Sequence, residues 1–572
     1  NSVAIGRLAL YAQDPASAAD MNNVAVGYLS GTAATTATAS TLIGSQAGSA
    51  LTSGINNTAV GAFSLNTDTL GKFSVAVGNG ALERQNFTSS TNVYNTAVGY
   101  DAGSRITTGT NNTLIGGLAG DATTTGTHNT AVGFDSLTTN TTATGNSAFG
   151  QSSLKNNTTG TSNTGLGGQA LQTNSTGSSN TAVGVLALYA NTTGGSNTAV
   201  GFEALRNNST GTRLTAIGYE ALGSNSSGNY NAAGGWKALN ANTTGTHNSA
   251  WGDGSLQFNT TGVGNSALGQ GALAANTTAN NNTAVGADAL KINTTGQYNT
   301  AMGVNALRSN TTANYSVAVG FEALKLTTTG VGNVGVGQSA LYSNTTGTDN
   351  TGVGYGVLDS STTGARNAAI GSGAGGATTT GPNNVFVGYL AGNYGTPNTT
   401  GHENTFLGSY SYAPATAIQV IAIGHSVVGT QGYTTVGYAS NDIRAAHGTA
   451  TWAAVSDQRY KKDIADSTAG LSFINALQPR TFNYRTLGEL PETFRAYEAD
   501  STEVYKSSQT QHGFIAQEVK AAIDADSSIA DGFKLWDDRD DGSQEVAETA
   551  LIPVLVKAIQ ELTARLETLE GE

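Results

Sequence analysis

The sequence predicts a mostly β protein, in which a long parallel β-roll or solenoid of 17-residue repeats precedes a C-terminal segment of different composition. Three observations predict this fold class: one glycine recurs at a constant step, glycine accounts for 76 of the 572 residues, and only 11% of the residues are charged. The chain has too few large apolar side chains for several globular cores, whereas its strict periodicity excludes disorder. A repetitive fold of thin layers satisfies both conditions.

The repeat unit reads approximately Asn-Thr-Ala-Val-Gly-x-x-Ala-Leu-x-x-Asn-Thr-Thr-Gly-x-x. Its first glycine, the key glycine, recurs every 17 residues from Gly99 to Gly388. Earlier key glycines keep this step, apart from four-residue insertions before Gly27 and before Gly99, and the step changes to 20 and then 16 after Gly388. Because an insertion within stacked coils breaks the pairing with both neighbours, each unit is interpreted as one coil. Residues 1–408 are therefore predicted to form a β-roll repeat rod.

Within each unit, the Thr-Ala-Val segment predicts a short strand, because β-branched residues favour strands. The key glycine and the Asn-Thr-Thr-Gly stretch predict turns, with positive φ at Gly and Asn. The Ala-Leu pair that follows, such as Ala204 and Leu205, is expected to fill the interior. Seventeen residues accommodate two short strands and two turns, and a rise of about 4.8 Å per coil gives a rod of about 110 Å.

Two recurring features of the repeat invite a functional interpretation. The frequent Asn-x-Thr pattern is interpreted as axial ladders of stacked amides rather than as N-glycosylation sites. The residue after the key glycine is often aromatic, and its rings either pack between protomers, which we favour, or stack on sugars. These aromatic residues are Tyr100, Phe134, Phe202, Tyr219, Trp236, Phe321, Tyr355 and Tyr389.

The repeats resemble the head repeats of YadA-type trimeric adhesins. The resemblance rests on segments such as Asn1-Ser2-Val3-Ala4-Ile5-Gly6 and Tyr315-Ser316-Val317-Ala318-Val319-Gly320, and it extends to about residue 424. It implies a left-handed roll packed as a parallel homotrimer. The 17-residue period is longer than the period typical of that family.

At the end of the repeats stands Ser456-Asp457-Gln458-Arg459-Tyr460-Lys461, followed by Lys462, Asp463 and Ile464. Further blocks are Leu477-Gln478-Pro479, Phe482-Asn483-Tyr484, Gly513-Phe514-Ile515-Ala516-Gln517-Glu518-Val519 and the segment from Leu551 to Leu562. In this order they resemble the C-terminal intramolecular chaperone domain of phage endosialidases and many tail fibres. The resemblance implies that residues 456–572 form a small α+β chaperone domain, which assembles three chains and then cuts itself off.

The cut that the resemblance implies uses a serine and a lysine. Ser456 would attack the carbonyl of Val455, cleaving the Val455–Ser456 bond, Lys461 would be the base, and Asp457 and Arg459 would support the local geometry. A serine hydroxyl needs such a base, and a desolvated, neutral lysine can serve. Residues five apart lie about 140° apart on a helix, so either the segment turns sharply or Lys461 comes from a neighbouring chain. The alternative is a chaperone that is retained uncleaved.

The C-terminal segment predicts a coiled coil from about 550 to 570. Apolar residues repeat there with spacings of three and four, the pattern of an a/d seam. These are Ile552, Leu555, Ile559, Leu562, Leu566 and Leu569. One helix cannot bury such a stripe alone, and the resemblance implies three. A bundle that trimerises first would align the rods, whose non-local pairing is slow to nucleate.

Between residues 409 and 455 the repeat decays into alternating strand-like segments, predicted to form a distal β tip or transition. In phage fibres such a tip often carries receptor contacts. By position alone, the candidates are Tyr410, Tyr412, His425, Tyr433, His447 and Trp452.

Charge and composition exclude several classes of partner. The net charge is -13, and residues 456–572 hold 22 of the 38 acidic and 12 of the 25 basic residues. Neither nucleic acid nor membrane insertion is expected, and cysteine is absent. No cofactor or metal is expected: Asp537, Asp541 and Glu548 fit part of a calcium-loop template, but Arg539 occupies a ligand position, so an acidic surface turn is predicted.

The leading hypothesis is a trimeric tail-fibre-like protein of a virion, which binds a cell-surface receptor, either a glycan or an outer-surface protein. Its only expected reaction is a single self-cleavage. The alternative is a bacterial cell-surface adhesin that retains its chaperone domain. A polysaccharide depolymerase is disfavoured, because no isolated acid pair stands in an inserted domain.

Overall fold

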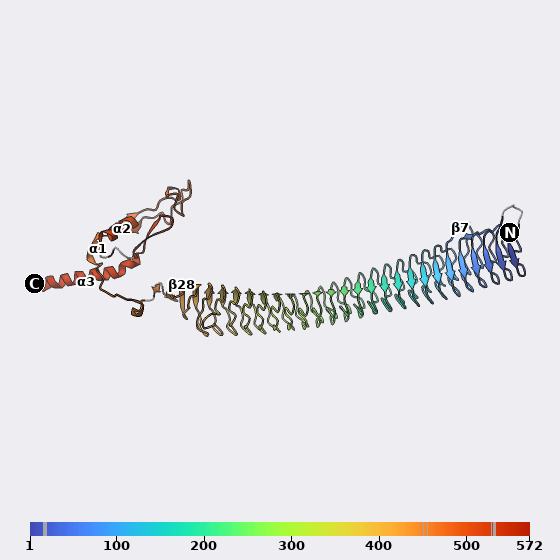
Figure 1. Cartoon of the computed structure of the whole chain (residues 1–572), viewed down its shortest axis with the longest axis horizontal. Coiled ribbons are helices and arrows are strands. Elements are labelled where there is room, and N and C mark those ends of the chain that lie inside the picture. The colour runs from blue at the N-terminus through green and yellow to red at the C-terminus, as the bar shows by residue number, and fades with distance from the viewer. Residues whose placement is uncertain (15–19, 450, 455, 528, 530–533, 572) are drawn as a thin grey trace. The chain divides into compact units, whose positions relative to one another are not determined.

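A computed structural model describes residues 1–14, 20–449, 451–454, 456–527, 529 and 534–571. The chain divides into two compact units, Asn1–Val455 and Ser456–Glu572, called the repeat unit and the C-terminal unit below (Figure 1).

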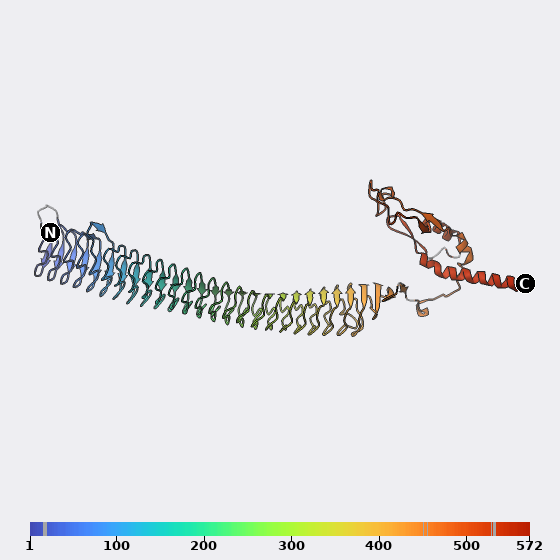
Figure 2. The ribbon, with the colours of Figure 1, turned by 180° about the vertical axis from the view of Figure 1, so that it is seen from behind.

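The repeat unit is a β-solenoid of 17-residue coils, as the sequence predicts. One short strand of each coil pairs in parallel with the strands of the coils before and after it; for example, Ala199 pairs with Ala182 and Ala216. Figures 1 and 2 show these strands stacked as rungs from the N-terminus to β28. The strands are β1 (Val3–Ile5), β2 (Val24–Val26), β3 (Thr41–Ile43), β4 (Thr58–Val60), β6 (Val75–Val77), β8 (Thr96–Val98), β9 (Thr113–Ile115), β10 (Thr130–Val132), β11 (Ser147–Phe149), β12 (Thr164–Leu166), β13 (Thr181–Val183), β14 (Thr198–Val200), β15 (Thr215–Ile217), β16 (Ala232–Gly234), β17 (Ser249–Trp251), β18 (Ser266–Leu268), β19 (Thr283–Val285), β20 (Thr300–Met302), β21 (Val317–Val319), β22 (Val334–Val336), β23 (Thr351–Val353), β24 (Ala368–Ile370), β25 (Val385–Val387), β26 (Thr405–Leu407) and β27 (Ile421–His425).

The interior of each coil is thin and is filled as predicted. The middle strand residue and the Ala-Leu pair after the key glycine are fully buried, as Ala199, Ala204 and Leu205 show. The first and third strand residues point outward, because side chains alternate along a strand.

The prediction of two strands per coil is wrong, since the regular coils contain one strand of three residues. The rest of the coil consists of turns whose N–H groups donate to the next coil: the Leu205 N–H donates to the Ala221 carbonyl (3.0 Å) and the Ser209 N–H to the Ser226 carbonyl (2.9 Å). Positive φ falls on the key glycine and on residues such as Leu205, with φ 53, rather than on the asparagine of the Asn-Thr-Thr-Gly turn. These left-handed residues turn the chain too often for a second strand.

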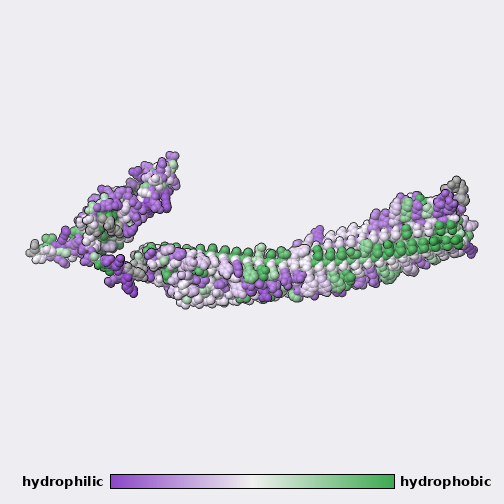
Figure 3. All heavy atoms as spheres, viewed as in Figure 1, coloured by the Kyte–Doolittle hydropathy of each residue, from purple (hydrophilic) through white to green (hydrophobic). Residues whose placement is uncertain are grey.

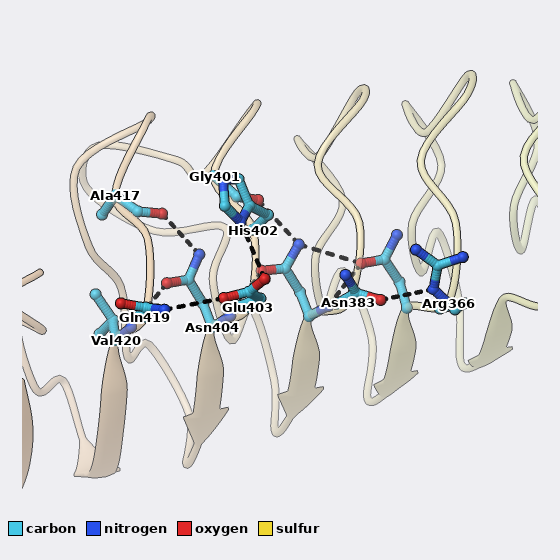
Figure 4. Close-up of polar contacts among 11 residues, drawn as sticks. Arg366, Asn383, Gly401, His402, Glu403, Asn404, Ala417, Gln419 and Val420 are labelled. Atoms are coloured by element: carbon cyan, nitrogen blue, oxygen red, sulfur yellow. Dashed lines mark hydrogen bonds and ion pairs between the residues drawn. The ribbon is translucent and has the colours of Figure 1, made fainter. Parts of the chain in front are cut away.

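Two columns of buried asparagines run along the repeat unit. In the column before the strands, each Oδ1 accepts from the backbone of the next coil, as Asn367 Oδ1 does from the Asn384 N–H at 2.9 Å. Asn404 Oδ1 likewise accepts from the Val420 N–H at 2.9 Å (Figure 4). In the second column, Asn208 Nδ2 donates to Asn191 Oδ1 at 2.9 Å. The interpretation as axial ladders is confirmed for these columns, and their burial makes them poor glycosylation acceptors in the folded unit.

The parallel stack ends in antiparallel strands. β28 (Tyr433–Tyr438) is parallel to β27, whereas β29 (Asn441–Ala446) is antiparallel to β28, and β30 (Ala453–Ala454) is antiparallel to β29. A small side pair joins β5 (Gly71–Lys72) to β7 (Thr91–Asn92), and β7 lies in the coil that the four-residue insertion before Gly99 lengthens.

The C-terminal unit is a small α/β region that ends in a helix. Its core contains Phe473, Val519, Leu535, Leu551 and Val554. The elements are the 3-10 helices η1 (Gln458–Tyr460), η2 (Leu487–Glu489) and η3 (Glu548–Ala550), the helices α1 (Leu471–Ala476), α2 (Ala516–Ala525) and α3 (Leu551–Glu570), and two antiparallel pairs, β31 (Arg480–Phe482) with β32 (Gln511–Gly513) and β33 (Trp536–Asp538) with β34 (Gln544–Val546). Among the described helices, none is long and apolar enough to cross a membrane.

Of the residues that partly fit a calcium loop, Asp537 and Asp541 lie in the β33–β34 hairpin, whereas Glu548 begins η3. Asp541 accepts hydrogen bonds from the Ser543 N–H at 3.0 Å and from the Ser543 hydroxyl at 2.6 Å, and these bonds lower the pKa of Asp541 to about 2. Gly542 adopts φ 82, which suits a tight turn.

Candidate active site and surface residues

The C-terminal unit begins with one turn of 3-10 helix, η1, and this turn places Lys461 beside Ser456. Asp457 caps the turn, because its Oδ1 accepts from the Arg459 N–H at 2.8 Å. The chain is extended again at Lys461, with φ -116 and ψ 144. The Lys461 Nζ thereby donates to the Ser456 Oγ at 2.6 Å within one chain. The sharp turn, one of the two geometries open from the sequence, is thus present in the single chain.

Asp457 and Arg459, the predicted supporting residues, pair with each other. Arg459 Nη2 lies 2.6 Å from Asp457 Oδ2, and Arg459 Nε lies 3.0 Å from Asp457 Oδ1. The arginine lowers the pKa of the Asp457 carboxyl, and the carboxylate raises the pKa of Arg459. Asp457 is thus neutralised by Arg459, and Lys461 is left to contact Ser456.

Ser456 and Lys461 have the geometry of a serine–lysine pair, but both side chains are exposed to solvent in the single chain. A lysine amine accepts a proton only when neutral, and burial away from water favours its neutral form. The geometry therefore aligns the nucleophile with its base, and activation requires something that covers them. Val455, which carries the carbonyl to be attacked, lies outside the described residues. The described residues contain no group of three or more side chains that would hold a metal ion.

Three of the predicted receptor contacts come together at the C-terminal end of the repeat unit. The Tyr410 ring contacts the His425 ring, with 5.4 Å between the ring centroids. Tyr410 also contacts Tyr389 and Tyr394, Tyr394 contacts Tyr412, and His425 stacks on Tyr438. These six residues form the aromatic cluster: Tyr389, Tyr394, Tyr410, Tyr412, His425 and Tyr438.

The other predicted contacts lie outside this group of rings. The Arg444 guanidinium lies over the Tyr433 ring at 5.2 Å, and His447 Nε2 lies 3.3 Å from the Thr434 hydroxyl. Trp452 is 53% exposed.

Sequence reasoning did not identify Tyr394 and Tyr438 as ring neighbours of the predicted contacts. Tyr438 directly follows Gly437, which pairs with the key glycine Gly424. Tyr394 stands in the coil that the 20-residue step after Gly388 lengthens. The break in the period, which the sequence displays, was the available signal for an irregular surface.

The aromatic residues that follow the key glycines are about half exposed along the whole repeat unit, for example Tyr100 at 60% and Trp236 at 48%. Some of them stack from coil to coil, as Phe202 and Tyr219 do, with 5.4 Å between ring centroids. Their exposure fits both interpretations drawn from the sequence, protomer packing and sugar stacking.

Residues from two of the blocks that carry the resemblance, the block at 482–484 and the block that begins at Gly513, line an open cleft. Its lining includes Phe482, Tyr484, Tyr505 and Phe514. Tyr484 contacts Phe482 and Tyr505 edge to face, with ring centroids 5.4 and 5.7 Å apart.

Comparison with known proteins bears on the C-terminal unit alone. Neither the curated proteins nor the solved structures contain a match to the chain. A family model described as "Chaperone of endosialidase" matches residues 456–526, from the serine of the candidate pair to the end of α2. The C-terminal unit is therefore similar to endosialidase chaperones over this segment, which supports a phage-type fibre that carries an intramolecular chaperone.

Proposed function

We propose that this protein is the subunit of a trimeric, tail-fibre-like receptor-binding protein of a virion, whose C-terminal unit assembles the trimer and is then released by cleavage before Ser456. The observation that carries the proposal is the 2.6 Å contact between Lys461 Nζ and Ser456 Oγ, at the first residue of the C-terminal unit and of the family match.

Self-association is supported by the sheet face, the surface made by the first and third residues of strands β1–β4, β6 and β8–β27. None of these residues is charged, and the third residue is apolar throughout, with Leu268 55% and Ile370 52% exposed. Figure 3 shows a hydrophobic stripe along the repeat unit. At about 4.8 Å per coil the face is about 120 Å long. Monomers rarely expose apolar patches larger than a few hundred Å².

Most ion pairs of the repeat unit join residues that stand two and five positions after a key glycine and so lie outside this face, as in Glu203 with Arg206 (3.3 Å) and Glu322 with Lys325 (2.6 Å). A partner that covers an uncharged face over its whole length must have the same period and length. Another copy of the repeat unit, aligned in parallel, meets both conditions.

The helix α3 supports assembly from the C-terminal end. Its Leu551, Val554 and Ala558 are buried in the core of the C-terminal unit. The predicted a/d residues lie on the exposed side, where Ile559 is 61% and Leu569 71% exposed. One face of α3 is thus used within the chain, and the second is left for the same helix of other chains.

Assembly would also supply what the serine–lysine pair lacks. Neighbouring chains that pack at the start of the C-terminal unit would remove water from Ser456 and Lys461 and favour the neutral amine. The amine would take the hydroxyl proton as the serine oxygen attacks the Val455 carbonyl, and the peptide nitrogen of Ser456 would leave as an amine, which gives an ester between Val455 and the Ser456 oxygen. Water would then hydrolyse this ester, releasing the Val455 carboxylate and restoring the Ser456 hydroxyl, and the chain would be cut. Cleavage would then occur only after the chains have assembled.

The test is expression of the full chain beside Ser456→Ala and Lys461→Met, with intact mass and light scattering as readouts. We expect the wild type to be a trimer cut before Ser456, and both variants to be uncut trimers. Lys462→Met, which changes the neighbouring exposed lysine, is the control and should be cut normally. A trimeric wild type that stays full length would refute self-cleavage and favour the adhesin that retains its chaperone, whereas a monomer would refute the assembly.

Receptor binding is tested separately, by adsorption of the labelled, assembled protein to bacterial cells. Saturable adsorption that excess unlabelled protein abolishes is expected. If no strain of a broad panel binds the protein, the receptor-binding part of the proposal fails, whatever the outcome of the cleavage test.

A further inference from the structure

We propose that the aromatic cluster is a binding site for a neutral oligosaccharide. This inference rests on the proposed receptor-binding function and assigns to it a place and a ligand class. The cluster consists of Tyr389, Tyr394, Tyr410, Tyr412, His425 and Tyr438, and its ring contacts form one connected set.

The rings offer both faces and edges to a ligand. Tyr394 meets Tyr410 and Tyr412 at interplanar angles of 70° and 73°, whereas His425 lies nearly parallel to Tyr438 at 17°. Tyr389 and Tyr394 are each 47% exposed, and Tyr438 is 64% exposed. Part of the ring surface therefore supports neighbouring rings, and the remainder faces solvent.

The fold builds this group only where the repeat loses its period. Tyr389 and His425 directly follow key glycines, as single aromatic residues do in regular coils. Tyr394 comes from the lengthened coil, and the next residue, Gly395, lies against the Tyr412 ring: a Cβ on Gly395 would lie 2.7 Å from that ring. Gly395 has φ 64, so the close approach and the backbone conformation both favour glycine.

A second copy of the chain is a poorer occupant of this site than an external ligand. An interface between in-register solenoids uses equivalent residues in coil after coil, because each coil meets its counterpart. Elsewhere in the described part of the repeat unit, ring contacts are isolated pairs, such as Tyr298 with Tyr315. The aromatic cluster occurs once among the described coils, at an irregular coil, so a contact that repeats from coil to coil between two solenoids does not require it.

The chemistry of the six side chains points to sugars. Five are tyrosines and one is histidine, so each ring combines an apolar face with a polar group at its edge. Sugar rings have the matching character, with C–H groups that stack on aromatic faces and hydroxyls that bond to polar edges. None of the six side chains bears a fixed charge, which favours a neutral sugar over an acidic one. Tyrosines held by their neighbours also bind with little loss of side-chain entropy.

The test uses the full chain on a printed array of neutral oligosaccharides of glucose, galactose, mannose and N-acetylhexosamines. We expect binding to at least one of them, and an affinity at least tenfold lower for Tyr394→Ala and for Tyr438→Ala. Tyr298→Ala is the matched control, because Tyr298 is 49% exposed and belongs to an isolated pair in a regular coil. It should bind as the wild type does.

Three results would overturn the inference: no binding of the wild type to any neutral oligosaccharide, equal affinity of wild type and cluster variants, or dissociation of the trimer in Tyr394→Ala or Tyr438→Ala. The last result would identify the cluster as a protomer contact. The sugar site and the proposed function can fail separately. If the protein is trimeric and cleaved, and adsorbs to cells equally well with and without the Tyr394 side chain, the proposed function stands and the sugar site is refuted.

Discussion

At the residue scale, the key glycines are set by the close stacking of the coils. Gly167 has φ 140, and a Cβ added to it would lie 2.5 Å from the carbonyl oxygen of Gly184 in the next coil. The following residue, Gly168, has nothing within 4 Å of such a Cβ and no positive φ. A side chain is therefore excluded at Gly167 by the backbone conformation and by the neighbouring coil, whereas neither excludes one at Gly168.

We predict that Gly167→Ala destabilises the repeat unit by at least about 2 kcal/mol, because strained φ and a backbone clash act together. Gly168→Ala is the matched control and should change stability by less than about 0.5 kcal/mol. Urea unfolding followed by circular dichroism measures both. Equal stability of the two variants would show that the coils separate easily enough to admit a methyl group.

Asp68 is a buried acid in the column that holds asparagine in most later coils. Its Oδ2 accepts from Gln85 Nε2 at 2.6 Å, and its Oδ1 accepts from the Phe87 N–H at 3.0 Å. Burial raises the pKa of Asp68, and these hydrogen bonds oppose the rise only in part. The folded chain therefore holds this proton to a higher pH than the unfolded chain.

This raised pKa gives a pH dependence with a defined sign. Below the unfolded pKa of about 3.8 both states are protonated; above it the unfolded state releases its proton first, so stability falls as pH rises through the folded pKa. We expect the melting temperature of the wild type minus that of Asp68→Asn to decrease between pH 3 and pH 7, as measured by thermal unfolding. A difference that increases with pH would mean that the hydrogen bonds outweigh burial.

At the element scale, the asparagine columns link the coils along the axis. Asn208 Nδ2 donates to Asn191 Oδ1 at 2.9 Å and to the Gly211 carbonyl at 3.1 Å, and Asn208 Oδ1 accepts from Asn225 Nδ2 at 2.9 Å. Removing one amide leaves buried polar groups on both neighbouring coils without these bonds.

Asn208→Ala should therefore lower the free energy of unfolding by about 2–4 kcal/mol, since an unsatisfied buried polar group costs about 1–3 kcal/mol. The neighbouring Asn207 is exposed, so Asn207→Ala controls for the loss of an amide and should stay within about 0.5 kcal/mol of the wild type. Denaturant unfolding compares the two. Similar effects of both substitutions would contradict a structural role of the ladder.

The sequence predicted the solenoid because its determinants are local and periodic. The key glycine, the Ala-Leu pair and the strand segment each reveal their place by recurring every 17 residues. The second strand was predicted wrongly because propensity does not reveal left-handed leucines: residues such as Leu205 adopt φ 53 only because the adjacent coils hold the turn, which is a tertiary effect.

The candidate pair was predictable as a motif but not as a geometry. Its spacing left open a sharp turn or a neighbouring chain, and the Asp457 cap with its ion pair to Arg459 accompanies the turn that the structure shows. The aromatic cluster was predictable only in part. Contacts between Tyr394 and Tyr410 depend on how the lengthened coil folds back, which no residue pattern specifies.

At the scale of the whole molecule, the repeat unit and the C-terminal unit expose different surfaces to the same proposed partner, another copy of the chain. The sheet face of the repeat unit is uncharged and neighbouring coils are alike, so the face by itself specifies the register between chains weakly. The exposed side of α3 is short but has a defined heptad pattern. An assembly that starts at α3 would fix the register that the repeats alone leave ambiguous.

If α3 starts the assembly and sets the register, substitutions on its exposed side alone should prevent trimer formation. Ile559 and Leu562 are 61% and 50% exposed, so Ile559→Glu with Leu562→Glu should leave the fold of the single C-terminal unit intact. The variant should fail to form trimers and should lose most of its cleavage, because separate chains leave Ser456 and Lys461 in water.

Light scattering measures the assembly, and intact mass measures the cut, in parallel with the control Arg565→Glu on the exposed surface of the same helix. The control should assemble and be cut as the wild type is, since it adds a similar change of charge outside the a/d seam. A double variant that still forms cleaved trimers would place the start of assembly on the sheet face. A monomeric variant that is still cut would show that the serine–lysine pair needs no neighbouring chain, and the 2.6 Å contact seen within one chain would then be sufficient for the reaction.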